Sequence, residues 1–182
     1  CKLVFMSSAN VFDAFSHYPS YELDKTLSES IYGKLKIRCE TMLMRTLPEE
    51  QYVIVRLPMV FGNGSPRIKE LNNQILLGDA IEVFPHLIIN TTTDAKLSQQ
   101  LHYIINRKLH GIFHLGSTDL IHHKEFINDL VSMLDLNRTP IFKNVYTSNY
   151  DRYLAVLPRD NKLPKHLSIT NEAVVDGSKK AL

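Results

Sequence analysis

The chain has 182 residues, 44% of them hydrophobic and 22% charged, a composition typical of a globular protein that buries a core. Its 21 basic and 19 acidic residues give a net charge of +2 without any long basic run, which argues against nucleic acid as a partner. No apolar stretch is long enough to cross a bilayer and the 2 cysteines cannot form a disulfide framework, so we expect no membrane partner and a cytoplasmic setting.

The first third of the chain predicts a strand, a loop, a helix and a second strand. Residues 2–7 are apolar and β-rich, as in a buried strand, and residues 9–24 have the composition of a long loop. We expect a helix from about Thr26 to Thr46, with a core-facing stripe formed by Ile31, Leu35, Cys39 and Met42. The strand Tyr52–Arg56 then leads into a turn-rich stretch over residues 61–66.

The remainder of the chain continues the alternation of strands and helices. Helices are predicted near residues 68–77, 93–107 and 122–136, and strands over residues 81–83, 87–89 and 111–115. Leu101, Ile104 and Ile105 are expected in the core, whereas residues 137–182 have less pattern. The alternation predicts an α/β fold, with helices packed on a sheet.

The candidate chemistry is a phenol, an ammonium and an alcohol. Tyr32 and Lys36 are four residues apart, so a helix places them on one face, and a positive charge beside a phenol favours its ionised form. Ser8, at the end of the first strand, would complete the set. A carbonyl held by two hydroxyls is polarised for hydride attack, with the tyrosine supplying the proton and a nicotinamide the hydride.

The Tyr-x-x-x-Lys spacing alone is weak evidence. In a chain with 8 tyrosines, chance supplies roughly 0.6 of such a pair, and an ordinary helix surface remains an alternative explanation. Tyr21 and Lys25 have the same spacing, but they lie in the predicted loop with no strand-borne serine at a suitable distance upstream. The flanking residues therefore decide how the pair is interpreted.

Three segments in order resemble the extended short-chain dehydrogenase/reductase superfamily, nearest its dTDP-4-dehydrorhamnose reductase-like branch. They are residues 5–13 (FMSSANVFD), residues 32–36 (YGKLK) followed by Glu40, and residues 56–62 (RLPMVFG). Weaker similarity continues at residues 93–94, 111–114 and 125–126, so the resemblance covers most of residues 2–136. Ala9 and Asn10 stand where the rhamnose-type enzymes usually have Asp and Tyr, which leaves the identity of the sugar open.

The resemblance implies the C-terminal part of a Rossmann-type doubly wound parallel sheet, plus a small mixed α/β substrate-binding region. Residues 1–62 would be the C-terminal half of the catalytic domain, and residues 63–182 mainly the substrate-binding region. A strand and a helix near residues 86–115 would pack back against the catalytic domain. The chain opens inside a strand without an initiator Met, so we expect a fragment that is inactive alone, its glycine-rich N-terminal half lying upstream of Cys1.

The resemblance also implies the roles of individual residues. Ser8, Tyr32 and Lys36 would be catalytic. The nicotinamide end of NAD or NADP would be bound by Ser7, Tyr32, Lys36, Pro58 and Met59. The nucleotide sugar would be bound by Ser8, Asn10 and Arg67, although Arg67 could equally be a solvated loop arginine.

The implied function is an NAD(P)-dependent oxidoreductase acting on a nucleotide sugar, foremost a 4-keto-sugar reductase, with a homodimer as a possible assembly. The alternatives are a nucleotide-sugar epimerase or dehydratase, or a non-catalytic relative such as the regulatory subunit of methionine adenosyltransferase. We expect no metal site, because His122 and His123 have no cluster of ligands around them and read as a solvated helix start.

Overall fold

The computed structural model describes residues 1–14, 17–62, 64–133 and 139–178. The helices are α1 (Ile31–Thr46), α2 (Pro66–Leu77), α3 (Asp94–Asn106), α4 (His123–Ser132) and α5 (Asn171–Ser178), with 3-10 turns η1 (Ala9–Phe12), η2 (Glu49–Gln51) and η3 (Lys165–Leu167). The strands are β1 (Leu3–Ser8), β2 (Tyr52–Leu57), β3 (Met59–Phe61), β4 (Ala80–Val83), β5 (Leu87–Ile89), β6 (Thr91–Thr93), β7 (Gly111–His114), β8 (Ile121–His122), β9 (Ile141–Asn144) and β10 (Arg152–Leu154).

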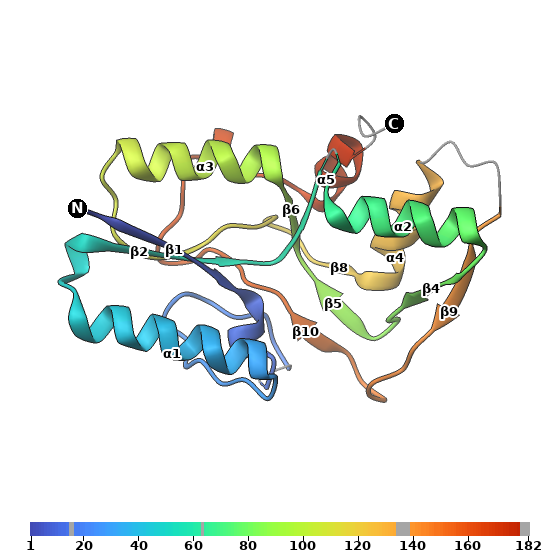
Figure 1. Ribbon diagram of the computed structural model, residues 1–182, viewed down its shortest axis with the longest axis horizontal. Coiled ribbons are helices and arrows are strands. Elements are labelled where there is room, and N and C mark those ends of the chain that lie inside the picture. The colour runs from blue at the N-terminus through green and yellow to red at the C-terminus, as the bar shows by residue number, and fades with distance from the viewer. Residues whose placement is uncertain (15–16, 63, 134–138, 179–182) are drawn as a thin grey trace.

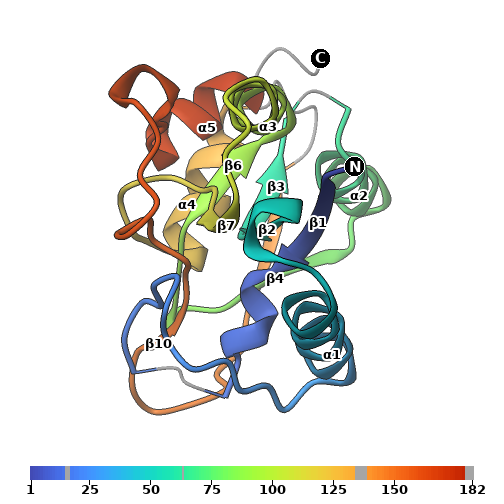
Figure 2. The ribbon, with the colours of Figure 1, turned by 90° about the vertical axis from the view of Figure 1, so that its left-hand side faces the viewer.

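One half of the molecule is a parallel three-stranded sheet between two helices. Its strand order is β1-β2-β7, and the register pairs Ser8 at the end of β1 with Leu57 at the end of β2. Helix α1 covers one face of the sheet and α3 covers the other (Figures 1 and 2). This arrangement confirms the predicted α/β class, and parallel strands buried under helices explain the apolar run over residues 52–55 of β2.

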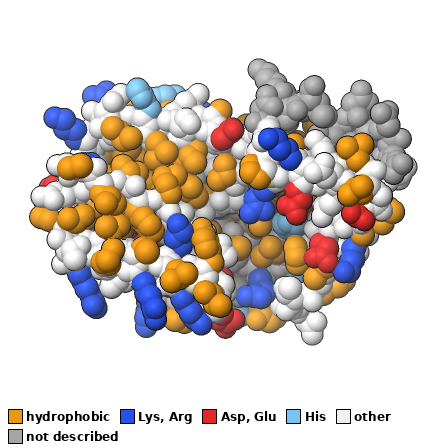
Figure 3. All heavy atoms as spheres, viewed as in Figure 1, with side chains coloured by type: hydrophobic (Ala, Val, Ile, Leu, Met, Phe, Trp, Pro, Cys, Tyr) orange, Lys and Arg blue, Asp and Glu red, His pale blue; other side chains and the backbone are white. Residues whose placement is uncertain are grey.

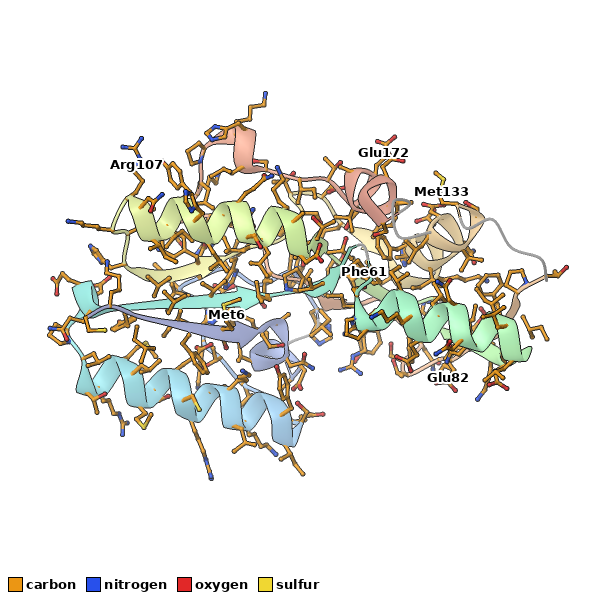
Figure 4. All side chains as sticks on the ribbon, turned by 45° about the horizontal axis from the view of Figure 1, so that its top comes forward. Met6, Phe61, Glu82, Arg107, Met133 and Glu172 are labelled. Atoms are coloured by element: carbon orange, nitrogen blue, oxygen red, sulfur yellow. The ribbon has the colours of Figure 1, made fainter. Side chains whose placement is uncertain are left out.

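The other half combines small sheets with the remaining helices. The strand orders are β10-β5-β8, β3-β6 and β4-β9, and α2, α4 and α5 lie on this side of the molecule (Figure 1). Its core is a single cluster that includes Phe61, Phe126 and Val174. Phe61 lies where the chain leaves the first half and enters α2, and Glu82 lies on β4 below that helix (Figure 4).

Helix α1 begins later than the sequence predicts. The side chain of Ser30 accepts a hydrogen bond from the Gly33 N–H at 3.1 Å and so caps the helix. The preceding Ser28 donates to the Asp13 carboxylate at 2.9 Å, which ties this segment to the loop instead of to a helical turn. The predicted helix over residues 122–136 is observed as α4, and its last part, from residue 134, lies outside the described residues.

The prediction that the apolar stripe of α1 faces the core is wrong. Ile31, Leu35 and Met42 are 79%, 53% and 57% exposed. The buried residues of the helix are Gly33, Glu40 and Leu43 instead. A Cβ atom at Gly33 would overlap the Asn10 carbonyl oxygen and the Ser28 hydroxyl, so the missing side chain permits the close approach that selects this face.

Apolar side chains are also exposed around the parallel sheet. Hydrophobic side chains gather on the face in Figure 3 over the half that holds β1, α1 and α3. Leu3 on β1 and Ile105 on α3 are exposed large hydrophobic residues, whereas Ile104 is fully buried and Leu101 packs against the core. The prediction of a buried α3 face therefore holds for Ile104 and Leu101 and fails for Ile105.

Six strands and α-helices were not predicted. These are β3, β6, β8, β9, β10 and α5. The residues of β9 are all exposed and gain their strand conformation by pairing with β4, more than fifty residues earlier in the chain. Such pairing leaves no periodic pattern within the segment itself.

Candidate active site

Ser8 is fixed at the carboxyl end of β1. It is the N-cap of η1, and its Oγ accepts a hydrogen bond from the Asn10 N–H at 3.2 Å. The same hydroxyl donates to Asn10 Oδ1 at 3.0 Å. In open α/β sheets, ligands bind outside the carboxyl ends of the strands, and Ser8 lies at that edge.

The first two turns of α1 carry Tyr32 and Lys36. The Lys36 ammonium lies 5.5 Å from the centre of the Tyr32 ring and 4.9 Å from that of Phe5. It donates a hydrogen bond to the Met6 carbonyl at 2.8 Å, and Met6 lies on β1 between α1 and α3 (Figure 4). The predicted one-face arrangement of the phenol and the ammonium is therefore present.

One cavity of about 540 Å³ brings most of the predicted site residues together. All of those residues except Lys36 line it, namely Ser7, Ser8, Asn10, Tyr32, Pro58, Met59 and Arg67. They come from β1, α1, β3 and α2, and from the loops between these elements. Lys36 does not line the cavity, but its ammonium lies beside the ring of Tyr32, which does.

The second Tyr-x-x-x-Lys pair lies elsewhere. Tyr21 and Lys25 are in the loop before α1, as predicted, and neither lines the cavity that contains Ser8. The Tyr21 ring instead carries the Arg159 guanidinium at 4.4 Å from its centre. Spacing alone thus occurs twice, and only Tyr32 shares a cavity with a strand-end serine.

A buried ion pair beneath the cavity was not predicted. Glu40 and Arg56 are 1% and 2% exposed, and Arg56 Nη2 donates to Glu40 Oε2 at 2.7 Å. The Ser7 hydroxyl donates to the other carboxylate oxygen of Glu40, and Arg56 Nη1 lies 3.4 Å from His114 Nε2. Glu40 and Arg56 both belong to the motifs identified in the sequence, and this membership could have marked them as site residues. That the two side chains form an ion pair could be seen only in the folded structure.

Arg67 also borders a second cavity, of about 450 Å³, between α2, β4 and α4. Met59 lines both cavities, so they adjoin. Among the described residues Arg67 has no carboxylate within ion-pair distance, and its guanidinium lies 5.9 Å from the centre of the Phe61 ring. Arg67 is therefore a cation at the border of the two cavities and can contact an anionic group there, although Glu70 and Glu82 also line the second cavity.

The interpretation of His123 as part of a solvated helix start is wrong. His123 is 8% exposed, lines the second cavity and accepts a hydrogen bond at Nδ1 from the Phe84 N–H at 3.3 Å. Burial, together with the charge of Arg67, lowers the pKa of His123 to about 4. The ring is therefore neutral at physiological pH, with its proton on Nε2.

His114 and His123 predict a loss of stability in acid. Burial, followed by the charge of Arg56, lowers the pKa of His114 to about 3. Because both native pKa values lie below 6.5, the unfolded state binds more protons, and stability falls as the pH decreases from about 6.5 toward the native values. Each histidine is expected to contribute up to about 1.4 kcal/mol per pH unit to the free energy of unfolding, measured by urea denaturation between pH 7 and pH 4.

Two variants check this assignment. His123→Gln should reduce the slope of unfolding free energy against pH, whereas the exposed His166, changed to Gln, should leave the slope as it is. Equal slopes in the two variants would contradict the burial of a neutral His123.

Neither a metal cluster nor a spanning helix is found in the described ranges. No group of three or more His, Cys, Asp or Glu side chains there could hold a metal ion. No helix within the same residues combines the length and the apolar character needed to cross a bilayer.

Comparisons with known proteins agree with this architecture. The family model described as the RmlD substrate binding domain matches residues 1–165. No curated protein matches the chain by sequence. Solved structures match the chain in fold at low sequence identity.

Three of these structures illustrate the range. A dTDP-4-dehydrorhamnose reductase from Clostridium acetobutylicum is 20% identical, with a TM-score of 0.76 over 97% of this chain and 65% of that one. The enzyme of the same name from Bacillus anthracis, in complex with NADP, is 21% identical, with a TM-score of 0.78 over 97% of this chain and 65% of that one. A UDP-glucuronic acid 4-epimerase from Bacillus cereus, in complex with NAD, is 14% identical, with a TM-score of 0.70 over 99% of this chain and 60% of that one.

The chain spans less than two thirds of the length of each of these three proteins. Its strand order, its strand-end serine and its helix-borne Tyr-x-x-x-Lys pair occur within the segment that the family model matches. The chain therefore belongs to the RmlD substrate binding domain family.

Proposed function

We propose that the protein is an NAD(P)-dependent oxidoreductase that reduces the keto group of a nucleotide sugar, in the manner of a dTDP-4-dehydrorhamnose reductase. One observation carries this proposal: Ser8 and Tyr32, from different elements, line one cavity, with the Lys36 ammonium beside the Tyr32 ring. A binding module has no need of this set of proton donors. Two of the three compared structures are reductases of the proposed kind.

In the proposed reaction, Tyr32 is the acid. Its phenol donates a proton to the carbonyl oxygen while the carbonyl carbon accepts a hydride, so that C=O becomes CH–OH and Tyr32 is left as a phenolate. The Lys36 ammonium stabilises that phenolate. NADH or NADPH, when bound, supplies the hydride.

Ser8 polarises the same oxygen. Its hydroxyl hydrogen points to Asn10 Oδ1 at 3.0 Å, so the substrate must replace this acceptor for Ser8 to donate to the carbonyl. The Asn10 N–H continues to hold Ser8 Oγ at 3.2 Å during the exchange. Asn10 thus orients the alcohol on the side where the sugar enters.

The cavity residues fit the nicotinamide end of the cofactor. Pro58 and Met59 provide an apolar wall for a flat ring, and Ser8 provides a hydroxyl, whereas the predicted contact of the Ser7 hydroxyl with the cofactor is not available because that hydroxyl donates to Glu40. The cavity volume of about 540 Å³ is of the size found for small ligands. No Gly-x-x-Gly-x-x-Gly turn occurs in the 182 residues, so we assign only this end of the cofactor site to the chain.

The substrate is assigned across the two adjoining cavities. Arg67 borders both, and its planar guanidinium matches the oxygens of a pyrophosphate. The sugar would lie in the cavity with Ser8 and Tyr32, and the nucleoside in the cavity with His123, whose Nε2–H can donate to an uncharged acceptor. A pyrophosphate at Arg67 joins the two parts.

A turnover assay tests this function. A full-length protein that contains this chain together with a nucleotide-binding half is incubated with dTDP-4-dehydrorhamnose and NADPH or NADH, and cofactor oxidation is followed together with sugar product. We expect one cofactor oxidised for each alcohol formed. Sugar conversion without net cofactor consumption would indicate an epimerase instead, and binding without any turnover would indicate the non-catalytic class.

A further inference from the structure

Helix α1 holds β1 at two successive residues immediately before Ser8. The Lys36 ammonium donates to the Met6 carbonyl at 2.8 Å, and the Ser7 hydroxyl donates to the Glu40 carboxylate. Tyr32, Lys36 and Glu40 follow one another at intervals of four residues, so they lie along one face of α1. The helix that carries Tyr32 is thereby joined to the strand that carries Ser8.

Arg56 on β2 fixes the Glu40 end of this connection. Its Nε lies 3.1 Å from Glu40 Oε1 and its Nη2 lies 2.7 Å from Oε2, a two-point contact that sets the plane of the carboxylate. Arg56 is itself held by the Glu22 carbonyl at 3.0 Å. The carboxylate that receives the Ser7 hydroxyl is therefore immobilised on both of its oxygens.

We propose that Glu40 is a positioning residue for the reaction, fixing through Ser7 the placement of the Ser8 hydroxyl relative to the Tyr32 phenol. This inference rests on the proposed function for its kinetic consequence. Neighbouring residues of a strand point to opposite faces, so a hydroxyl that locks Ser7 also sets the direction in which Ser8 is presented. Displacement of a reacting group by about 1 Å can lower the rate about 100-fold.

A purely structural role is a weak explanation for this cluster. Buried ion pairs can often be replaced by apolar side chains of similar volume without loss of stability, because desolvation of the charges offsets their attraction. The Glu40 and Arg56 side chains are almost completely buried, and Arg56 is paired in register with Ser7 at the end of the sheet that carries Ser8. We therefore infer that the hydrogen bonds of Glu40 with Ser7 and Arg56 fix the position of the strand end more than they stabilise the fold.

Two sets of variants test the proposal. Ser7→Ala removes the hydroxyl that contacts Glu40, and the double variant Glu40→Met with Arg56→Met removes the carboxylate without leaving a charge buried. We expect each to lower kcat by about 10- to 100-fold, with the KM for the nucleotide sugar within about threefold and the pH profile unchanged. A variant that combines Ser7→Ala with the two Met substitutions should lose no more kcat than either set alone, because both sets break the same contact between Ser7 and Glu40. Ser7→Thr, which restores a hydroxyl, should recover kcat.

Thr91→Val is the matched control. Thr91 is fully buried in β6, and its hydroxyl donates to Asn171 at 2.7 Å, away from the Ser8 cavity. The control should lose stability as Ser7→Ala does and keep kcat. An unchanged kcat in folded Ser7→Ala, or a fall in activity no larger than in Thr91→Val, would overturn the positioning role.

A measurement without turnover separates this proposal from the proposed function. Hydrogen exchange of the Asn10 amide, which donates to Ser8 Oγ, reports how firmly Ser8 is held. We expect at least tenfold faster exchange in Ser7→Ala and in the double variant, and no change in Thr91→Val. If the wild-type full-length protein has no reductase activity, the proposed function fails, and the exchange rate alone decides the positioning role, which unaltered exchange would overturn.

Discussion

Replacement of Tyr32 by Phe is expected to lower turnover of the keto sugar by about 10²- to 10⁴-fold, the usual contribution of a general acid. The variant loses one hydroxyl from a half-exposed side chain at the start of α1 and keeps the ring that contacts Lys36. Cofactor affinity and melting temperature should therefore stay near the wild-type values. Single-turnover kinetics with NADPH, together with thermal unfolding, measure both quantities.

Tyr21→Phe is the control for this experiment. Tyr21 has a lysine at the same spacing, but it lies in a loop outside the Ser8 cavity. Its change to Phe should leave turnover intact. Comparable turnover in the Tyr32 and Tyr21 variants would remove the acid role from Tyr32 and with it the main argument for reductase chemistry.

Replacement of Arg56 by Met alone is expected to lower the free energy of unfolding by about 3–5 kcal/mol, because it leaves the Glu40 carboxylate buried without its cation. The Glu22 carbonyl and His114 Nε2 would lose a partner in the same step. Urea denaturation at pH 7 measures the loss. This is the largest effect on stability that we expect from a single substitution in the cluster.

Two comparisons isolate the cause. Arg38, on the exposed side of α1, should tolerate the same change to Met within about 0.5 kcal/mol. Adding Glu40→Met to Arg56→Met should recover most of the loss, since no charge then remains buried. If the double variant is as unstable as Arg56→Met, packing volume is responsible instead of the uncompensated charge.

The sequence predicted which residues lie together better than it predicted the packing around them. Ser8, Tyr32, Pro58, Met59 and Arg67 border one cavity, although their catalytic and binding roles stay predictions. The resemblance to a known family supplied these residues, and their meeting is consistent with a parallel sheet, in which the strand ends and the start of the intervening helix share one edge. The placement of Tyr32 beside Lys36 required only that the segment be helical, because the two residues are four positions apart.

The packing of α1 shows why a periodic pattern can mislead. The stripe through Ile31, Leu35 and Met42 has helical spacing, yet it is exposed. The buried residues of the helix are Gly33, Glu40 and Leu43, of which one lacks a side chain and one is charged. Because only Leu43 among them is a large apolar residue, the pattern of apolar residues pointed to the wrong face.

The sequence by itself determined the alternation of strands and helices, the late position of Ser8 on its strand and the one-face spacing of Tyr32 with Lys36, since each follows from neighbours within a few residues. Only the tertiary structure decided which face of α1 is buried, that Glu40 pairs with Arg56 and that His123 is enclosed beside Arg67. These features depend on contacts between residues 16 to more than 50 positions apart, and such contacts form only when the chain folds.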